Sequence, residues 1–141
     1  MGGKIATMNN KNQVVLALSL LMFSAAGLAE WSEIDKFEDG MRVFVDRGSV
    51  QRAGDIAQVA HLVRWAEPQL EPGQPPYLST KVITSYDCVG KREKYLSSVS
   101  YAGAMGSGAR VAVDDNEAEG WYSISLSSME EKLWKVACQP R

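Results

Sequence analysis

The sequence predicts an α+β fold: an antiparallel β-sheet of about six strands with a C-terminal helix packed on it and one disulfide. Two observations support the prediction. Between residues 31 and 125, runs rich in β-branched and aromatic residues alternate with turn residues, which is typical of consecutive short strands. After Ser128 the apolar residues recur with the period of an amphipathic helix.

Residues 1–29 are predicted to be a cleavable secretory signal peptide. A start with two lysines precedes the apolar run VVLALSLLMF of residues 14–23, and small residues then lead to Ala29. A membrane anchor is the alternative, but this run has half of the roughly 20 apolar residues that span a bilayer. We expect cleavage between Ala29 and Glu30, which leaves residues 30–141 as one domain.

The mature chain is mildly acidic. Removing Lys4 and Lys11 with the signal leaves 13 basic residues against 17 acidic ones, a net charge near −4. Such a chain has no general electrostatic attraction to nucleic acid or anionic lipid, so neither is an expected partner. A domain of this size buries a modest core, which a covalent cross-link helps to stabilise.

Cys88 and Cys138 are the only cysteines. In an exported protein an even pair is usually a disulfide, and closing a loop of about 50 residues stabilises the fold by roughly 4 kcal/mol. The alternative is a reactive or metal-binding thiol pair. The two residues are far apart in sequence, with no CxxC spacing and no clustered histidines, so we predict a structural disulfide.

The expected strands share alternating or continuous apolar patterns bounded by glycine, aspartate or proline. In chain order they are residues 31–34, 41–46 with a brief continuation at 50–52, 56–65, 77–88, 91–101, 109–113 and 121–125. Residues 47–49 are expected to break the second strand. Residues 67–76 contain four prolines and are expected to form an exposed connection, because proline removes a donor from the ladder. Their PxxP pattern offers a proline-motif ligand as the alternative.

The C-terminal segment has the signals of a helix. Ser128 and Glu131 form a capping box, with Ser128 as N-cap. Acidic residues open the helix and lysines follow, which suits the helix dipole. One apolar stripe is made of Met129, Leu133 and Val136.

No constellation of residues predicts catalysis, a metal or a cofactor, and we expect a protein that is not an enzyme. His61 is the only histidine and lies in an apolar strand, where a structural imidazole is favoured over a general base. No GxSxG motif is present. The acidic loop of residues 114–120 lacks the EF-hand pattern for calcium, and the glycine-rich residues 103–108 lack the lysine of a phosphate loop.

One local charge feature could serve binding. Lys91, Arg92 and Lys94 cluster in sequence, and Lys81 lies on the preceding strand, so a hairpin would gather them into a basic patch. The patch is either a solvated face that discourages edge pairing or a docking surface for an anion or a protein.

Several landmarks occur in an order that resembles a known family. They are Trp31, Phe44-Val45-Asp46, Ser49 to Arg52, Ile56 to Trp65, Tyr77 to Lys81, Tyr86-Asp87-Cys88, Met105 to Gly108, Trp121 and Leu133 to Cys138. Over residues 31–139, this chain resembles the surface-adhesin protein E-like domain of Gram-negative bacteria. The resemblance implies an antiparallel sheet whose C-terminal helix is fastened by a Cys88–Cys138 bridge.

The resemblance also implies a function. The family's founding member is a lipid-anchored surface adhesin that binds host matrix and serum proteins and can dimerise. We therefore expect an exported binding protein with a protein partner and, as an option, a homodimer. No cysteine follows the expected cleavage site, so no stable membrane anchor is expected and the protein is periplasmic, surface-bound or secreted. The alternative function is a periplasmic cell-envelope accessory or small-ligand-binding module.

Overall fold

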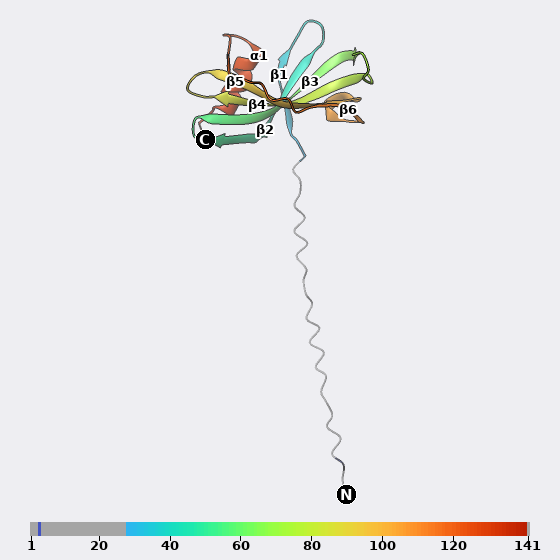
Figure 1. Ribbon diagram of the computed structural model, residues 1–141, viewed down its shortest axis with the longest axis horizontal. Coiled ribbons are helices and arrows are strands. Elements are labelled where there is room, and N and C mark those ends of the chain that lie inside the picture. The colour runs from blue at the N-terminus through green and yellow to red at the C-terminus, as the bar shows by residue number, and fades with distance from the viewer. Residues whose placement is uncertain (1–2, 4–27, 141) are drawn as a thin grey trace.

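The computed structural model describes Gly3 and residues 28–140, and Figure 1 shows their arrangement. The predicted signal peptide therefore lies almost entirely outside the described residues. A seven-stranded antiparallel sheet forms the body, in the order β1-β2-β3-β4-β5-β6, with β7 beside β5. From β1 to β6, each strand pairs with the next in sequence. The prediction of an α+β fold with about six strands and one C-terminal helix is confirmed.

The first three strands are longer than the sequence patterns indicated, the next three agree with their expected limits to within one residue, and β7 is shorter than expected. The sheet contains β1 (Trp31–Lys36), β2 (Arg42–Ala53), β3 (Ile56–Gln69), β4 (Tyr77–Asp87), β5 (Arg92–Tyr101), β6 (Arg110–Asp114) and β7 (Tyr122–Ser123). A short 3-10 turn, η1 (Ala104–Gly106), connects β5 to β6, and the helix α1 spans Met129–Ala137.

The helix α1 covers one face of the sheet at one end, while η1 lies at the opposite end in Figure 1. Leu133 and Ala137, both about 1% exposed, pack into a core with residues of β2, β3 and β4. The sheet's main contributions to this core are Val45, Ala57, Val59 and Tyr86. These side chains share one face because successive strand residues alternate.

The predicted break at residues 47–49 is instead a bulge within β2. The register with β3 shifts between Asp46 and Gln51, and the strand continues on both sides. Polar side chains satisfy the backbone there: the Asp46 carboxylate accepts from Gly48 N–H, and Ser49 Oγ accepts from Ala60 N–H. The sequence indicated that the strand is irregular at residues 47–49. Because side chains satisfy the backbone there, the irregularity is a bulge within a continuous strand.

The proline-rich connection begins later than predicted, since β3 runs to Gln69 and includes Pro68. The ladder to β4 is interrupted between Arg64 and Gln69. Pro68 falls in that interruption, where a missing N–H costs no ladder hydrogen bond.

The glycine-rich β5–β6 connection is bound to the sheet. The buried Ser79 hydroxyl donates to Gly103 O at 2.7 Å and accepts from Gly106 N–H at 2.9 Å. Both bonds hold η1 over β4, so this glycine-rich segment has a fixed position. Among the described residues, no helix is long and apolar enough to cross a membrane.

The predicted disulfide is present, with Cys88 and Cys138 Cα atoms 5.5 Å apart. It joins the turn after β4 to the end of α1. A helix of nine residues is marginal on its own, so this link matters for its position.

We predict that Cys138→Ser lowers the free energy of unfolding by about 2–4 kcal/mol. For a domain of this size the melting temperature should fall by roughly 10–20 °C, as measured by circular dichroism. Reductant should lower the wild-type value similarly and leave the variant's unchanged. An equal melting temperature for variant and wild type would contradict the stabilising role.

Candidate functional site

The turn between β4 and β5 is organised by Asp87. Its Oδ1 accepts hydrogen bonds from the backbone N–H of Val89 and Gly90, at 3.1 and 2.7 Å. Its Oδ2 accepts from the Arg92 guanidinium at 2.7 Å. The hydrogen bond from the Gly90 N–H, and next in size the one from the Arg92 side chain, hold the pKa of the Asp87 carboxyl below its usual range. A Cβ on Gly90 would come within 2.5 Å of Asp87 Oδ2, so the close approach requires glycine.

The start of α1 is tied to the same turn. Ser128 Oγ accepts from Glu131 N–H at 3.1 Å, which confirms Ser128 as the N-cap. The Glu131 carboxylate lies between Lys91, at 2.5 Å, and Lys135, at 3.2 Å. These ammonium groups, Lys91 first, lower the pKa of Glu131 to about 2. Lys91 adopts a left-handed φ of 50°, a conformation that costs roughly 1 kcal/mol for a non-glycine residue.

The end of α1 is fixed by Trp134 and Cys138. The Trp134 indole N–H donates to Asp87 O at 3.0 Å, and Lys91 Nζ lies 5.4 Å from the centre of the indole ring. With the Lys91–Glu131 ion pair and the Cys88–Cys138 disulfide, four interactions join the β4–β5 turn to α1. We call this set of contacts the junction.

Exposed apolar side chains surround the junction. Val89 in the turn is 77% exposed, Tyr122 on β7 is 63% exposed, and Leu126 before α1 is 78% exposed. They are gathered at one end of the sheet because β7 pairs with the start of β5, and Ile124 N–H donates to Lys91 O. We call Val89, Lys91, Arg92, Tyr122 and Leu126 the junction surface.

Three of the four basic residues that the sequence grouped together each form an ion pair in the structure. Lys91 pairs with Glu131 as above, Arg92 pairs with Asp87 at 2.7 Å, and Lys94 pairs with Glu117 at 2.5 Å. A carboxylate therefore accompanies each of these three cations.

Lys81 lies elsewhere on β4. It pairs with Val99, whereas Lys94 pairs with Ser85, about 13 Å further along β4. Lys81 instead borders a hollow of about 350 Å³ with Trp31, Leu62 and Tyr101. Three of the four basic residues are thus near one another and one is apart. Their role in docking stays a prediction.

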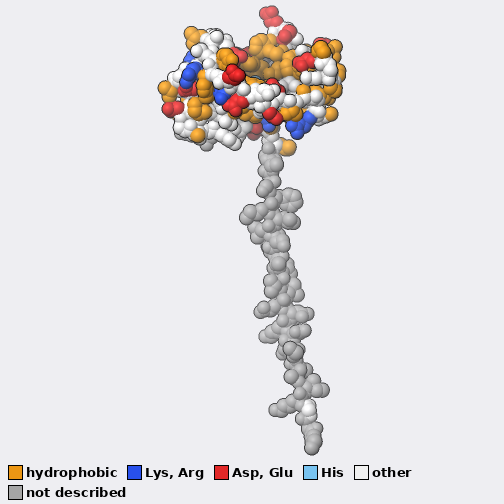
Figure 2. Space-filling view, viewed as in Figure 1, with side chains coloured by type: hydrophobic (Ala, Val, Ile, Leu, Met, Phe, Trp, Pro, Cys, Tyr) orange, Lys and Arg blue, Asp and Glu red, His pale blue; other side chains and the backbone are white. Residues whose placement is uncertain are grey.

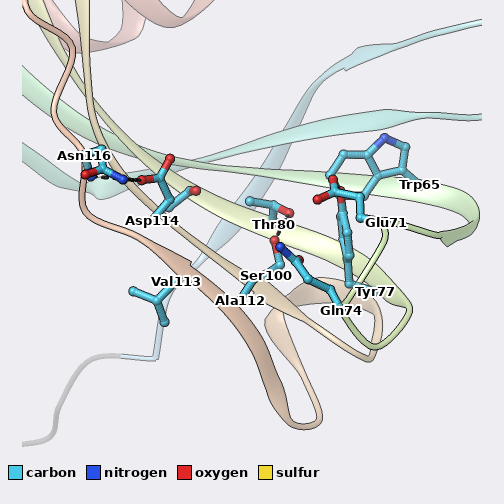
Figure 3. A pocket seen from close by; sticks show the side chains of 11 residues that line it. Trp65, Glu71, Gln74, Tyr77, Thr80, Ser100, Ala112, Val113, Asp114 and Asn116 are labelled. Atoms are coloured by element: carbon cyan, nitrogen blue, oxygen red, sulfur yellow. Dashed lines mark hydrogen bonds between the residues drawn. The ribbon is translucent and has the colours of Figure 1, made fainter.

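A larger groove of about 510 Å³ lies between the β3–β4 connection and β6 (Figure 3). One wall carries Trp65 and Tyr77, whose rings meet edge to face with centroids 5.2 Å apart. The Tyr77 hydroxyl donates to Glu71 at 2.5 Å, and this bond and burial raise its pKa to about 12. The opposite wall carries Asp114.

The groove residues were not singled out from the sequence. Trp65 and Tyr77 were assigned to strand ends on either side of the proline-rich connection, and Asp114 to an acidic loop. Their one sequence signal is that two aromatic residues flank a connection containing carboxylate and amide side chains. Only the hairpin geometry brings Asp114 to the same groove.

His61 and Tyr86 border a smaller cavity of about 190 Å³ under α1. Within the described part of the chain, His61 Nδ1 and the Tyr86 hydroxyl have no hydrogen-bond partner. Burial lowers the pKa of His61 to about 4 and raises that of Tyr86. His61 is therefore neutral at physiological pH. Among residues 28–140 no three His, Cys, Asp or Glu side chains gather as metal ligands.

Comparison with known proteins identifies a family and a fold. A family model described as surface-adhesin protein E matches residues 31–139. One structure of Haemophilus influenzae protein E has a TM-score of 0.62 at 13% identity, covering 79% of this chain and 85% of that chain. Its crystal form II has a TM-score of 0.58 at 14% identity, covering 68% and 79%. At such identities the likeness shows the fold. No curated protein matches the chain.

We predict that Glu131→Gln flattens the acid limb of the stability curve. The pKa of Glu131 is about 2 when folded and ordinarily 4.5, so its contribution is complete above pH 4.5 and is lost as the pH falls towards 2. Wild type should have a larger free energy of unfolding than Glu131→Gln at pH 7, and this difference should shrink as the pH falls from 4.5 to 2.

The measurement is urea unfolding at a series of pH values. Glu130→Gln is the matched control, because it removes the same charge from the same helical turn but leaves the Lys91 ion pair intact. Parallel curves for wild type and Glu131→Gln between pH 4.5 and 2 would refute the assignment.

Proposed function

The chain belongs to the surface-adhesin protein E family, and from this premise we propose that it is an exported, non-enzymatic binding protein that attaches to a protein partner. The observation that carries the proposal is the family match, which covers residues 31–139 and so nearly the whole of the mature domain. The family is one of surface adhesins and not of enzymes. Host matrix or serum proteins are the partners we propose.

The junction surface supports a protein partner. Its exposed side chains include tyrosine and arginine, the types enriched where binding energy is concentrated in protein interfaces. Its cations already have carboxylate partners within the fold, so they contribute little net positive charge to a distant partner. We infer that apolar contact from Tyr122 and Leu126 supplies most of the affinity, with Arg92 as a polar rim.

The rigidity of the junction favours binding. The disulfide, the Glu131 ion pair and the Trp134 hydrogen bond fix the backbone next to the exposed side chains. A surface held in place before binding loses less conformational freedom when the partner attaches.

A second candidate is a periplasmic envelope module that binds a small ligand. The observation that favours it is the groove of Figure 3, whose volume of about 510 Å³ falls within the range of roughly 300–1,000 Å³ for ligand sites. The two candidates differ in location and in the surface that they use.

We predict that Leu126→Ser weakens binding to the protein partner about five- to thirtyfold, because truncating a central apolar contact costs about 1–2 kcal/mol. Binding is measured by surface plasmon resonance against a panel of purified matrix and serum proteins. Leu70→Ser is the matched control: Leu70 is also 78% exposed but lies on the β3–β4 connection. A loss with Leu70→Ser and none with Leu126→Ser would place docking elsewhere.

We predict that protease added to intact cells degrades the mature protein, as expected for a surface adhesin. Immunoblotting of the protein before and after treatment gives the measurement, with a known periplasmic protein as the protection control. Complete protection until the outer membrane is opened would contradict the adhesin proposal and support the periplasmic candidate.

A further inference from the structure

One end of the groove is lined by aromatic side chains, and the rest of its lining is mostly polar. Trp65 is half-buried and Tyr77 is fixed by its bond to Glu71, so the wall offers aromatic surface in a set orientation. Figure 3 shows this aromatic pair and Glu71 on one side and Asp114 with Asn116 on the other, with the strands between them. A ligand that fills the groove must therefore present both an apolar face and hydrogen-bonding groups.

The floor of the groove is lined by hydroxyls. Thr80 and Ser100 lie opposite each other on β4 and β5, with their oxygens 2.8 Å apart. Ser98 lies on the same face of β5 and accepts from the Tyr95 hydroxyl at 2.9 Å. These hydroxyls both donate and accept, so they suit a ligand that itself carries hydroxyls.

The two carboxylates are oriented and keep capacity to accept. Asp114 Oδ1 accepts from the backbone and side-chain amides of Asn116, at 2.9 and 2.8 Å, and these bonds lower its pKa. Glu71 Oε1 accepts from Tyr77. An ionised carboxylate has about four acceptor positions, so each can take further hydrogen bonds from a ligand.

The charge of the groove restricts the ligand. No lysine, arginine or histidine lines it, and among residues 28–140 neither Glu71 nor Asp114 forms an ion pair. An anionic ligand would meet two uncompensated carboxylates. A neutral ligand rich in hydroxyl donors meets good acceptors at both ends.

We propose that this groove binds a neutral saccharide of one or two sugar units. The C–H face of a sugar ring packs on Trp65, and its hydroxyls donate to Glu71 and Asp114 and exchange hydrogen bonds with Thr80 and Ser100. This site lies at the opposite end of the domain from the junction surface and does not rest on the protein-partner proposal. The sugar's source is either a host glycan or an envelope polysaccharide, which share this chemistry.

The test is titration of the ¹⁵N-labelled mature domain with lactose, as a host-type glycan, and with N,N′-diacetylchitobiose, as an envelope-type glycan. All four tryptophans lie within the mature domain and give four indole N–H signals. We expect the Trp65 signal, assigned by its absence in Trp65→Phe, to shift in a saturable manner with at least one sugar. Which sugar binds more tightly distinguishes the two sources.

Variants then test the polar contacts. Asp114→Asn should weaken saccharide binding at least tenfold, whereas Asp115→Asn, the same change one residue outside the groove lining, should leave it unchanged. Trp65→Phe should weaken binding and Trp121→Phe should not, with melting temperature as the check on folding. Leu126→Ser should bind the saccharide normally, which separates this site from the junction surface.

Three results would overturn the proposal. They are no shift of the Trp65 signal with either sugar, equal affinities for Asp114→Asn and Asp115→Asn, and binding of a cationic peptide such as tetralysine in the absence of any saccharide binding. The last result would reassign the carboxylates to the recognition of basic peptides.

Discussion

The position of α1 depends on one constraint: its attachment to the turn that follows β4. A nine-residue helix forms too few internal hydrogen bonds to be stable alone, so its contacts with the sheet must stabilise it. Apolar packing of Leu133 and Ala137 stabilises the helix against the sheet but does not fix its orientation. The orientation of the helix is fixed by the disulfide, the Trp134–Asp87 hydrogen bond and the Lys91–Glu131 ion pair. Asp87 is central because its side chain accepts hydrogen bonds from the turn backbone, and its carbonyl oxygen accepts the hydrogen bond from the Trp134 indole of the helix.

Much of this arrangement could be predicted from sequence because it rests on local signals. Ser128 caps the helix where the pattern indicated, by accepting a hydrogen bond from Glu131 N–H. The cysteine pair followed from composition and expected export. The strand limits were harder, because the bulge at Asp46 and the ladder gap around Pro68 depend on hydrogen bonds between strands. Local propensity does not contain that information.

The sites were less predictable than the fold for the same reason. Lys91, Arg92 and Lys94 were adjacent in sequence, but their carboxylate partners come from α1, β4 and the loop after β6. Charge counting along the chain could not show that each cation is paired. Glu131 appeared as a capping residue, and the structure adds that it also binds Lys91 of the distant turn. The groove residues come from three segments, so no short motif could reveal them.

The length of α1 also explains why the sheet carries two different surfaces. Thr80 and Thr84 lie on the same face of β4; Thr84 borders the cavity under α1, whereas Thr80 lies in the groove beyond the helix. A helix of nine residues, about 14 Å long, covers only part of β3 and β4, whose 14 and 11 residues extend further. The uncovered part must be compatible with water, which accounts for its hydroxyls and carboxylates. The covered end, in contrast, is cross-linked and displays apolar side chains at its rim. One fold thus separates the junction surface, where we propose that a protein partner binds, from a polar groove with an aromatic wall, where we propose that a small neutral ligand binds.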